Sequence, residues 1–65
     1  MKQYDVFELS KDINPNIKKG LRGVVLQIYS DGIFEVEFVN DDGMNIEFDG
    51  HSRFTIDLSY IKMFN

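Results

Sequence analysis

Strict alternation of apolar and polar residues through the middle of the chain constrains the fold most. Apolar side chains recur at every second position in three runs, residues 24–29, 34–39 and 44–49. Short turn sequences that end in Gly32 and Gly43 separate the runs. A period of two is typical of a half-buried β-strand, whereas an amphipathic helix requires a period near 3.6. The pattern therefore predicts three consecutive antiparallel strands joined by hairpins.

The segments before these runs predict one more strand and a long loop. Residues 5–10 mix apolar residues with acids and fit a short first strand. Residues 11–23 are rich in Lys, Asn, Pro and Gly, which is the composition of a loop. A loop of this length is either functional or packed over the end of the sheet, so we expect Ile13 and Ile17 to anchor it to the core.

The C-terminal part of the sequence predicts a last strand and a short helical turn. Residues 53–57 carry the alternating pattern again, with Phe54 and Ile56 facing inward. Residues 58–61 favour a helical turn, after which the chain reaches Met63 and Phe64. With no repeat or linker, the chain is expected to form one all-β domain, residues 1–65, of five strands.

Turn geometry predicts the register of the three central strands. Three-residue loops at 30–32 and 41–43, each closed by a glycine with positive φ, keep opposed residues on one face of the sheet. The predicted inward pairs are Ile28 with Phe34, Leu26 with Val36, Val24 with Phe38, Phe38 with Ile46, and Val36 with Phe48. The expected buried set is Val24, Leu26, Ile28, Phe34, Val36, Phe38, Met44, Ile46, Phe48, Phe54 and Ile56.

Acidic residues are concentrated in the same central region. Between Ser30 and Ser52 there is no Lys or Arg, and the seven acids are Asp31, Glu35, Glu37, Asp41, Asp42, Glu47 and Asp49. The predicted register places Glu37 opposite Glu47 and Glu35 opposite Asp49, and each such pair costs up to about 1 kcal/mol. Two interpretations stay open: a surface that binds a cationic partner, and a surface that only keeps a small β-protein soluble.

Composition excludes several classes of protein. The 65 residues include no cysteine, so neither a disulfide scaffold nor a thiolate zinc site is available, and a cytoplasmic location is expected. No signal peptide or membrane-spanning run is recognisable. The net charge of -4 repels phosphate backbones, which disfavours nucleic acid as a partner.

Catalytic, metal and cofactor motifs are not recognisable, so we predict a protein that is not an enzyme and needs no cofactor. His51 is the single histidine and fits a plain turn better than a metal site. Residues 40–43 lack the spaced oxygen ligands of a calcium loop. Carboxylates on an open sheet face lack the pocket that would separate their pKa values for acid and base catalysis.

Several segments together resemble known small β-barrels. Residues 19–25 form a glycine-bracketed entry to a strand that is similar to SH3-like barrels, including the KOW type. Joined to residues 4–6, 29–32, 34–38 and 55–58, this segment resembles the small bacterial family called domain of unknown function 4926. The resemblance implies a five-stranded, SH3-like antiparallel barrel with a short helical turn near the C-terminus.

The same resemblance carries no activity, because the family label names none. The sequence departs from the family pattern in the longer connection at residues 49–52, so the register of the last strand stays open. Similar small acidic proteins neutralise bacterial toxins, which by analogy implies a basic protein partner, such as a toxin nuclease, for an immunity or antitoxin-type inhibitor.

Three binding hypotheses follow, and the oligomeric state stays open in all of them. In the first, a basic protein binds an acidic face; its residues are Gln27, Tyr29, Glu35, Glu37, Glu47 and Asp49. In the alternative, a KOW-like module contacts RNA through a basic loop; its residues are Lys11, Lys18, Lys19 and Arg22. A third and weaker hypothesis is an aromatic cage for a methylated amine, built from Tyr29 and Tyr60.

Overall fold

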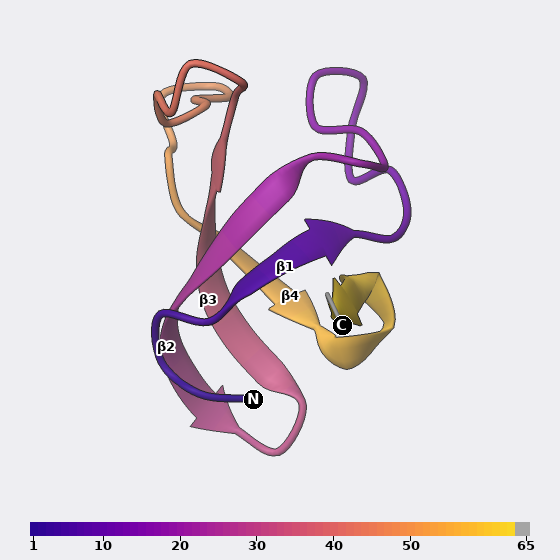
Figure 1. Cartoon of the computed structure of the whole chain (residues 1–65), viewed down its shortest axis with the longest axis vertical. Coiled ribbons are helices and arrows are strands. Elements are labelled where there is room, and N and C mark those ends of the chain that lie inside the picture. Colours follow the sequence, from indigo (N-terminus) through magenta and orange to yellow (C-terminus); the bar gives the residue numbers. More distant parts are fainter. Residues whose placement is uncertain (64–65) are drawn as a thin grey trace.

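The computed structural model describes residues 1–63. Its five strands form one antiparallel sheet, which bends around a single core (Figure 1). The elements are β1 (Val6–Leu9), β2 (Arg22–Ser30), β3 (Ile33–Val39), β4 (Phe54–Asp57), the 3-10 turn η1 (Leu58–Tyr60) and β5 (Ile61–Met63). The strand order is β4-β3-β2-β1-β5. The all-β class, the five antiparallel strands and the helical turn near the C-terminus are therefore confirmed.

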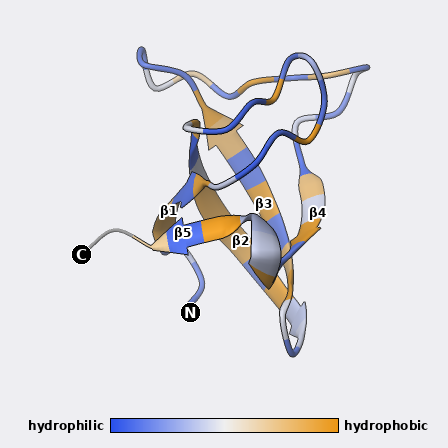
Figure 2. Cartoon of the chain, turned by 90° about the vertical axis from the view of Figure 1, so that its right-hand side faces the viewer, coloured by the Kyte–Doolittle hydropathy of each residue, from blue (hydrophilic) through white to orange (hydrophobic). Residues whose placement is uncertain are grey.

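The alternation along β3 is confirmed residue by residue. Phe34, Val36 and Phe38 are buried, while Glu35 and Glu37 lie half-exposed on the other face. Figure 2 shows the same alternation as stripes of opposite hydropathy along this strand. Because β3 contains no irregularity in its pairing with β4, the period of two runs through it unbroken.

The predicted inward face of β2 is wrong over most of its length. Val25 is fully buried, whereas Val24 and Leu26 are half-buried and Ile28 is 41% exposed. The predicted pair of Ile28 with Phe34 is present, but a register shift at Leu26 pairs Val25 with Val36. One extra residue in a strand puts the side chains on its two sides out of phase, so β2 keeps the predicted register beside the hairpin, at Ile28, and has the opposite face inward at residues 22–25.

The predicted strand at residues 44–49 is absent, and β5 takes the fifth place in the sheet instead. Residues 45 and 46 continue the edge beside the end of β3, where the Ile46 N–H donates to the Phe38 carbonyl at 2.9 Å. The rest of that edge belongs to β4, in which Phe54 pairs with Val36. Consequently Ile46, Phe48 and Phe54 only pack against the core, and Met44 is 64% exposed.

Both glycines predicted at the hairpins adopt positive φ, 78° at Gly32 and 82° at Gly43. The loop at 41–43 has the predicted length of three residues, since Asn40 and Met44 are joined by a backbone hydrogen bond. The loop before β3 is shorter, because Ser30 pairs with Ile33 and leaves Tyr29 as the extra residue. The net register at Ile28 is unchanged by this difference.

The long loop after β1 is anchored as expected. Ile17 is fully buried and Ile13 packs against the core. The predicted buried set did not include Phe7, Leu9 and Ile17, which complete the core. β5 pairs with β1, so Met63 ends the described part of the sheet, and Phe64 lies outside the described residues.

Candidate functional site

Two tight turns build a projecting segment between β3 and β4. In the first, the Asn40 side-chain oxygen accepts from the N–H groups of Asp42 and Met44, both at 3.0 Å. In the second, Phe48 and His51 exchange backbone hydrogen bonds at 2.8 and 3.0 Å around Asp49 and Gly50. Both central residues of this turn have positive φ, as a type I′ turn requires, and Asp-Gly is a favoured sequence for it.

We call residues 40–52 the acidic loop. Its carboxylates are all exposed: Asp41, Asp42, Glu47 and Asp49. No Lys or Arg lies within it. Figure 1 shows the acidic loop, in salmon to orange, rising from the same end of the molecule as loop 10–21 and opposite to the β2–β3 turn. The fold therefore gathers four of the seven clustered acids on one projection.

A second group of predicted site residues lies on β2 and β3, closer to the β2–β3 turn than to the acidic loop. Gln27 pairs directly with Glu35, and the Tyr29 hydroxyl donates a hydrogen bond to the Glu35 carboxylate. Arg53 approaches the other Glu35 oxygen at 3.5 Å. Glu35 is thus neutralised by Arg53, and the side chain presents little free charge.

The bond between Tyr29 and Glu35 also affects the tyrosine. It raises the pKa of the Tyr29 hydroxyl above its usual range, because ionisation would lose the donated proton. Desolvation and the negative charge of Glu35 act in the same direction, while the positive charge of Arg53 lowers the pKa. Tyr29 therefore stays a neutral donor well into alkaline solution.

The predicted pairing of Glu35 with Asp49 is wrong, because Glu35 lies opposite Thr55 on β4. Residues 45 and 46 keep the predicted register beside β3, but the strand pairing does not extend to Glu47, and on its other side Glu37 lies opposite Val24. The Glu37 carboxylate accepts a hydrogen bond from the Asn45 amide at 3.1 Å. The reason is the position of β4, which occupies the edge where the acids of residues 47–49 were expected. The six predicted residues thus form two groups rather than one face.

The basic residues of the alternative hypothesis are also divided by the structure. Lys11 places its ammonium 4.3 Å from the centre of the Tyr60 ring. Arg22 lies on β2, directly opposite Glu8 on β1, rather than on the loop. The backbone N–H of Lys19 donates to Asp12 at 2.8 Å, and Lys18 and Lys19 are exposed. Because the Lys11 ammonium already occupies a face of the Tyr60 ring, that face is not available to a methylated amine in the predicted aromatic cage.

The Lys11 contact continues into the 3-10 turn. Asp57 caps η1 by accepting from the Ser59 N–H at 2.8 Å and from the Ser59 hydroxyl at 2.5 Å. The hydrogen bonds from Ser59 lower the pKa of the Asp57 carboxyl; desolvation opposes them, and the nearby charge of Lys11 adds a weaker lowering effect. The loop and the turn are therefore joined through polar groups.

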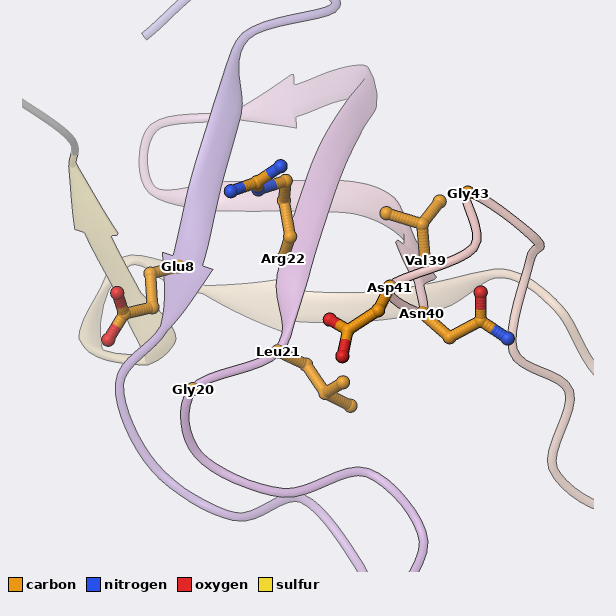
Figure 3. Close-up of a pocket in the computed structure, with 8 residues that line it drawn as sticks. All are labelled: Glu8, Gly20, Leu21, Arg22, Val39, Asn40, Asp41 and Gly43. Carbon is orange, nitrogen blue, oxygen red and sulfur yellow. The ribbon is translucent and has the colours of Figure 1, made fainter.

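A hollow of about 280 Å³ separates the acidic loop from the end of loop 10–21 (Figure 3). Its lining residues are Glu8, Gly20, Leu21, Arg22, Val39, Asn40, Asp41 and Gly43. The charged groups around it have both signs, since Glu8 and Asp41 accompany Arg22. A phosphate group would meet two carboxylates here, so the hollow does not favour a polyanion.

Within residues 1–63, no group of three or more His, Cys, Asp or Glu side chains is placed to hold a metal ion. Over the same range, no helix has the length and apolar character needed to cross a bilayer.

Comparisons with known proteins identify the family. A family model described as "Domain of unknown function (DUF4926)" matches residues 3–48, which is more than half of the chain. The match covers β1, β2, β3 and the first of the two turns of the acidic loop, and it ends at Phe48. No curated protein and no solved structure matches the chain. The chain belongs to the domain of unknown function 4926 family.

Proposed function

We propose that this protein is a non-catalytic binding module that recognises a positively charged protein surface. One observation carries the proposal: the acidic loop displays four exposed carboxylates and no Lys or Arg on a projection from the sheet. The exposed Asp31 at the opposite turn and the half-exposed Glu37 extend the negative potential along β3. A charge distribution of this kind attracts a cationic partner and speeds its association.

The more specific proposal is an inhibitor of the immunity or antitoxin type. A nuclease must present cationic groups to its phosphate substrate, and those groups are the natural target of an acidic projection. A domain of 65 residues could block such a site by occupancy alone, with no chemistry of its own. The division of the predicted site is compatible with this role, because the acidic loop can enter a cationic cleft of the partner while Gln27, which lies on β2, makes no contact.

The RNA hypothesis has less support from the geometry. Of its four residues, Lys11 is held at Tyr60 and Arg22 lies on a strand opposite Glu8. Lys18 and Lys19 then remain as a pair of exposed charges on the loop, which is a small footprint for a phosphate backbone. We keep RNA binding as an outcome that the experiment must separate from protein binding.

The experiment begins with capture of a partner from the native host, followed by titration of the purified partner at two salt concentrations. Glu47→Gln and Asn16→Lys each raise the net charge by one unit, but only the first lies in the acidic loop. We expect Glu47→Gln to weaken binding and slow association more than Asn16→Lys, and added salt to reduce the difference.

Charge reversal at Lys18 and Lys19 tests the alternative, that the basic loop carries the function. The double change Lys18→Glu and Lys19→Glu is expected to leave the affinity for a cationic protein intact or to raise it. If this double change abolishes binding while Glu47→Gln has no effect, the acidic loop is only a solubilising surface and a basic-loop function replaces the proposal.

A further inference from the structure

The outer side of β4 is an open sheet edge. β4 stands first in the strand order β4-β3-β2-β1-β5, so β3 is its only neighbouring strand. Figure 2 shows β4 at the right-hand side of the sheet, with no other strand beyond it. Within residues 1–63, no backbone hydrogen bond joins residues 53–56 to any segment other than β3. Unpaired N–H and C=O groups along an edge are a template for another strand.

The pairing with β3 determines which backbone groups of β4 point outward. The Ile46 N–H donates to the Phe38 carbonyl, so every second residue of β3, counted from Phe38, directs its backbone groups to this edge. The β3 partners of Phe54 and Ile56 are in the same phase, so these two residues use their backbone groups for β3. The N–H and C=O of Thr55, which lies between them, therefore point away from the sheet.

The side chains of residues 53–57 are self-complementary in an antiparallel pairing. In order they are Arg53, Phe54, Thr55, Ile56 and Asp57. A two-fold axis at Thr55 would place Phe54 opposite Ile56 of the other copy, and Arg53 opposite Asp57 at both ends. A shift by two positions in either direction would place Arg53 or Asp57 opposite Thr55 and lose both charge pairs. The order of charges therefore favours one register.

Both charged side chains can accept a further partner. Arg53 is 68% exposed and approaches Glu35 through one nitrogen, whereas a guanidinium group carries five N–H donors. Asp57 is exposed, and a single oxygen, Oδ1, accepts both hydrogen bonds from Ser59. Within residues 1–63, Lys11 forms no ion pair with Asp57. The contacts inside one copy therefore leave a donor group and an acceptor oxygen for a second copy.

We infer that β4 is the contact strand of a two-fold homodimer, in which the β4 strands of two copies pair antiparallel about Thr55 and join the two sheets. The partner is a second copy of this chain, because the reverse order of charges that the edge requires is its own. The other edge strand, β5, is unsuited to such a pairing, since Lys62 is its middle residue and would face itself across the axis. The inference goes beyond the proposed function, and neither depends on the other.

The proposed pairing keeps the two acidic loops apart. The acidic loop enters β4 at its N-terminal end, and antiparallel pairing puts the N-terminal ends of the two strands on opposite sides of the axis. The like-charged loops then do not face each other, and both stay accessible. Because β4 has only four residues, the contact is small, and we expect a dissociation constant of about 0.1–1 mM.

Sedimentation of the full chain from about 10 µM to a few mM tests for the dimer and its central contact. Thr55→Pro removes the outward N–H, and proline is tolerated in an edge strand where that group faces solvent. We expect this variant to fold, as shown by a thermal melt, and to dimerise at least about tenfold more weakly. Thr55→Val is the control, because it keeps the N–H and should keep the dimer.

A second pair of variants tests the charge order. Arg53→Glu and Lys62→Glu each lower the net charge by two units, and both residues are exposed. Only Arg53 faces Asp57 of the other copy in the proposed register. Arg53→Glu should weaken dimerisation at least about tenfold, whereas Lys62→Glu should change it by less than about threefold.

Cross-linking locates the axis, because the chain contains no cysteine of its own. Thr55 and Gln27 both lie opposite Glu35, on the same face of the sheet, and both are exposed, but only Thr55 lies on an edge strand. In a glutathione buffer, Thr55→Cys should form disulfide-linked dimers at least about tenfold faster than Gln27→Cys.

Three results would overturn the inference. A chain that stays monomeric over the whole concentration range lacks the contact. A dimer that tolerates both Thr55→Pro and Arg53→Glu uses another surface. Equal rates of cross-linking for Thr55→Cys and Gln27→Cys would show that copies meet at random rather than along β4. Weakening by Thr55→Pro and Arg53→Glu, together with selective cross-linking through Thr55→Cys, supports the antiparallel β4 pair.

Discussion

The ring of Phe7 lies directly against the backbone of Gly23. A Cβ atom on Gly23 would lie 2.4 Å from the ring carbon Cζ, which is shorter than any real contact of this kind. Phe7 is fully buried and meets Phe38 edge-on, with ring centroids 6.0 Å apart, and Phe38 in turn meets Phe54 at 5.6 Å. The absence of a side chain at Gly23 of β2 therefore makes room for a row of aromatic rings from β1, β3 and β4.

Replacement of Gly23 by alanine should destabilise the protein through this contact. The added methyl group would displace a fully buried ring, and overpacking of this kind costs about 1–3 kcal/mol. Urea unfolding of Gly23→Ala measures the loss. Combination with Phe7→Leu should give a smaller loss than the sum of the two single changes, and strict additivity would show that the ring is not the cause.

Gly43→Val should destabilise the protein for a different reason. A Cβ at Gly43 meets no atom within 4 Å, but the positive φ of 82° strains a β-branched residue. We expect a loss of more than about 1 kcal/mol in a thermal melt. Gly43→Asn is the control, since asparagine tolerates this conformation and should cost less; equal losses would point to a cause other than φ.

The pKa of Tyr29 should depend on Glu35. Since the hydrogen bond and charge of Glu35 both raise this pKa, Glu35→Gln should move it back towards the ordinary value for tyrosine. The signal of the ring carbon that bears the hydroxyl, followed by NMR through alkaline pH, reports the change. Glu37→Gln serves as the control, because Glu37 bonds to Asn45 instead. An equal effect of both variants would contradict the geometry at Tyr29.

Asp57 should make stability fall in acid. Its folded-state pKa is lowered by the hydrogen bonds from Ser59, so its contribution is present above the ordinary carboxyl pKa and is lost as pH falls through the lowered value. Asp57→Asn should therefore be less stable than the natural sequence at neutral pH and equal to it in strong acid. Ser59→Ala should show a smaller version of the same pattern. A difference independent of pH would exclude the carboxylate as the cause.

Glu47→Lys should leave stability within about 0.5 kcal/mol of the natural sequence, because Glu47 is exposed on the acidic loop and faces no carboxylate across a strand pair. The sequence-based register predicts a slight gain from relief of repulsion with Glu37. Urea unfolding at low salt distinguishes the two, since a gain that disappears on addition of salt would restore the predicted pairing of Glu37 with Glu47.

The sequence was a sound guide to β3 and a poor one to β2. In β3, charged and apolar residues alternate, so only one face can be buried. In β2, Val24, Val25 and Leu26 are all apolar, and the alternation does not tell which face they bury. Two hydrogen bonds from outside the strand stabilise the bulge at Leu26. The Gln3 side-chain amide donates to the Leu26 carbonyl, and the Tyr4 N–H donates to the Val25 carbonyl. Because these hydrogen bonds join residues far apart in the sequence, the sequence around β2 does not reveal the bulge.

The candidate site was divided for a similar reason. Residues 44–49 have the alternation of a strand, and the turn before them has the predicted length. However, β3 has only one free edge there, and residues 54–57 occupy most of it. The pairing of Glu35 with Arg53 follows from that competition. Local sequence shows that a segment can form a strand, but the choice between two segments depends on the whole core.

The interruption of one sheet edge makes the acidic loop a replaceable insert. The edge beside β3 is formed by residues 45–46 and then by β4, and the residues between them leave the sheet and return to it. Each doubling of such a connection costs only about 0.6 kcal/mol in closure entropy. Related chains can therefore lengthen, shorten or recharge this insert while the strands stay unchanged. Ile46 and Phe48 keep this insert packed against the core, so the positions that can change most freely are its exposed carboxylates and turn residues.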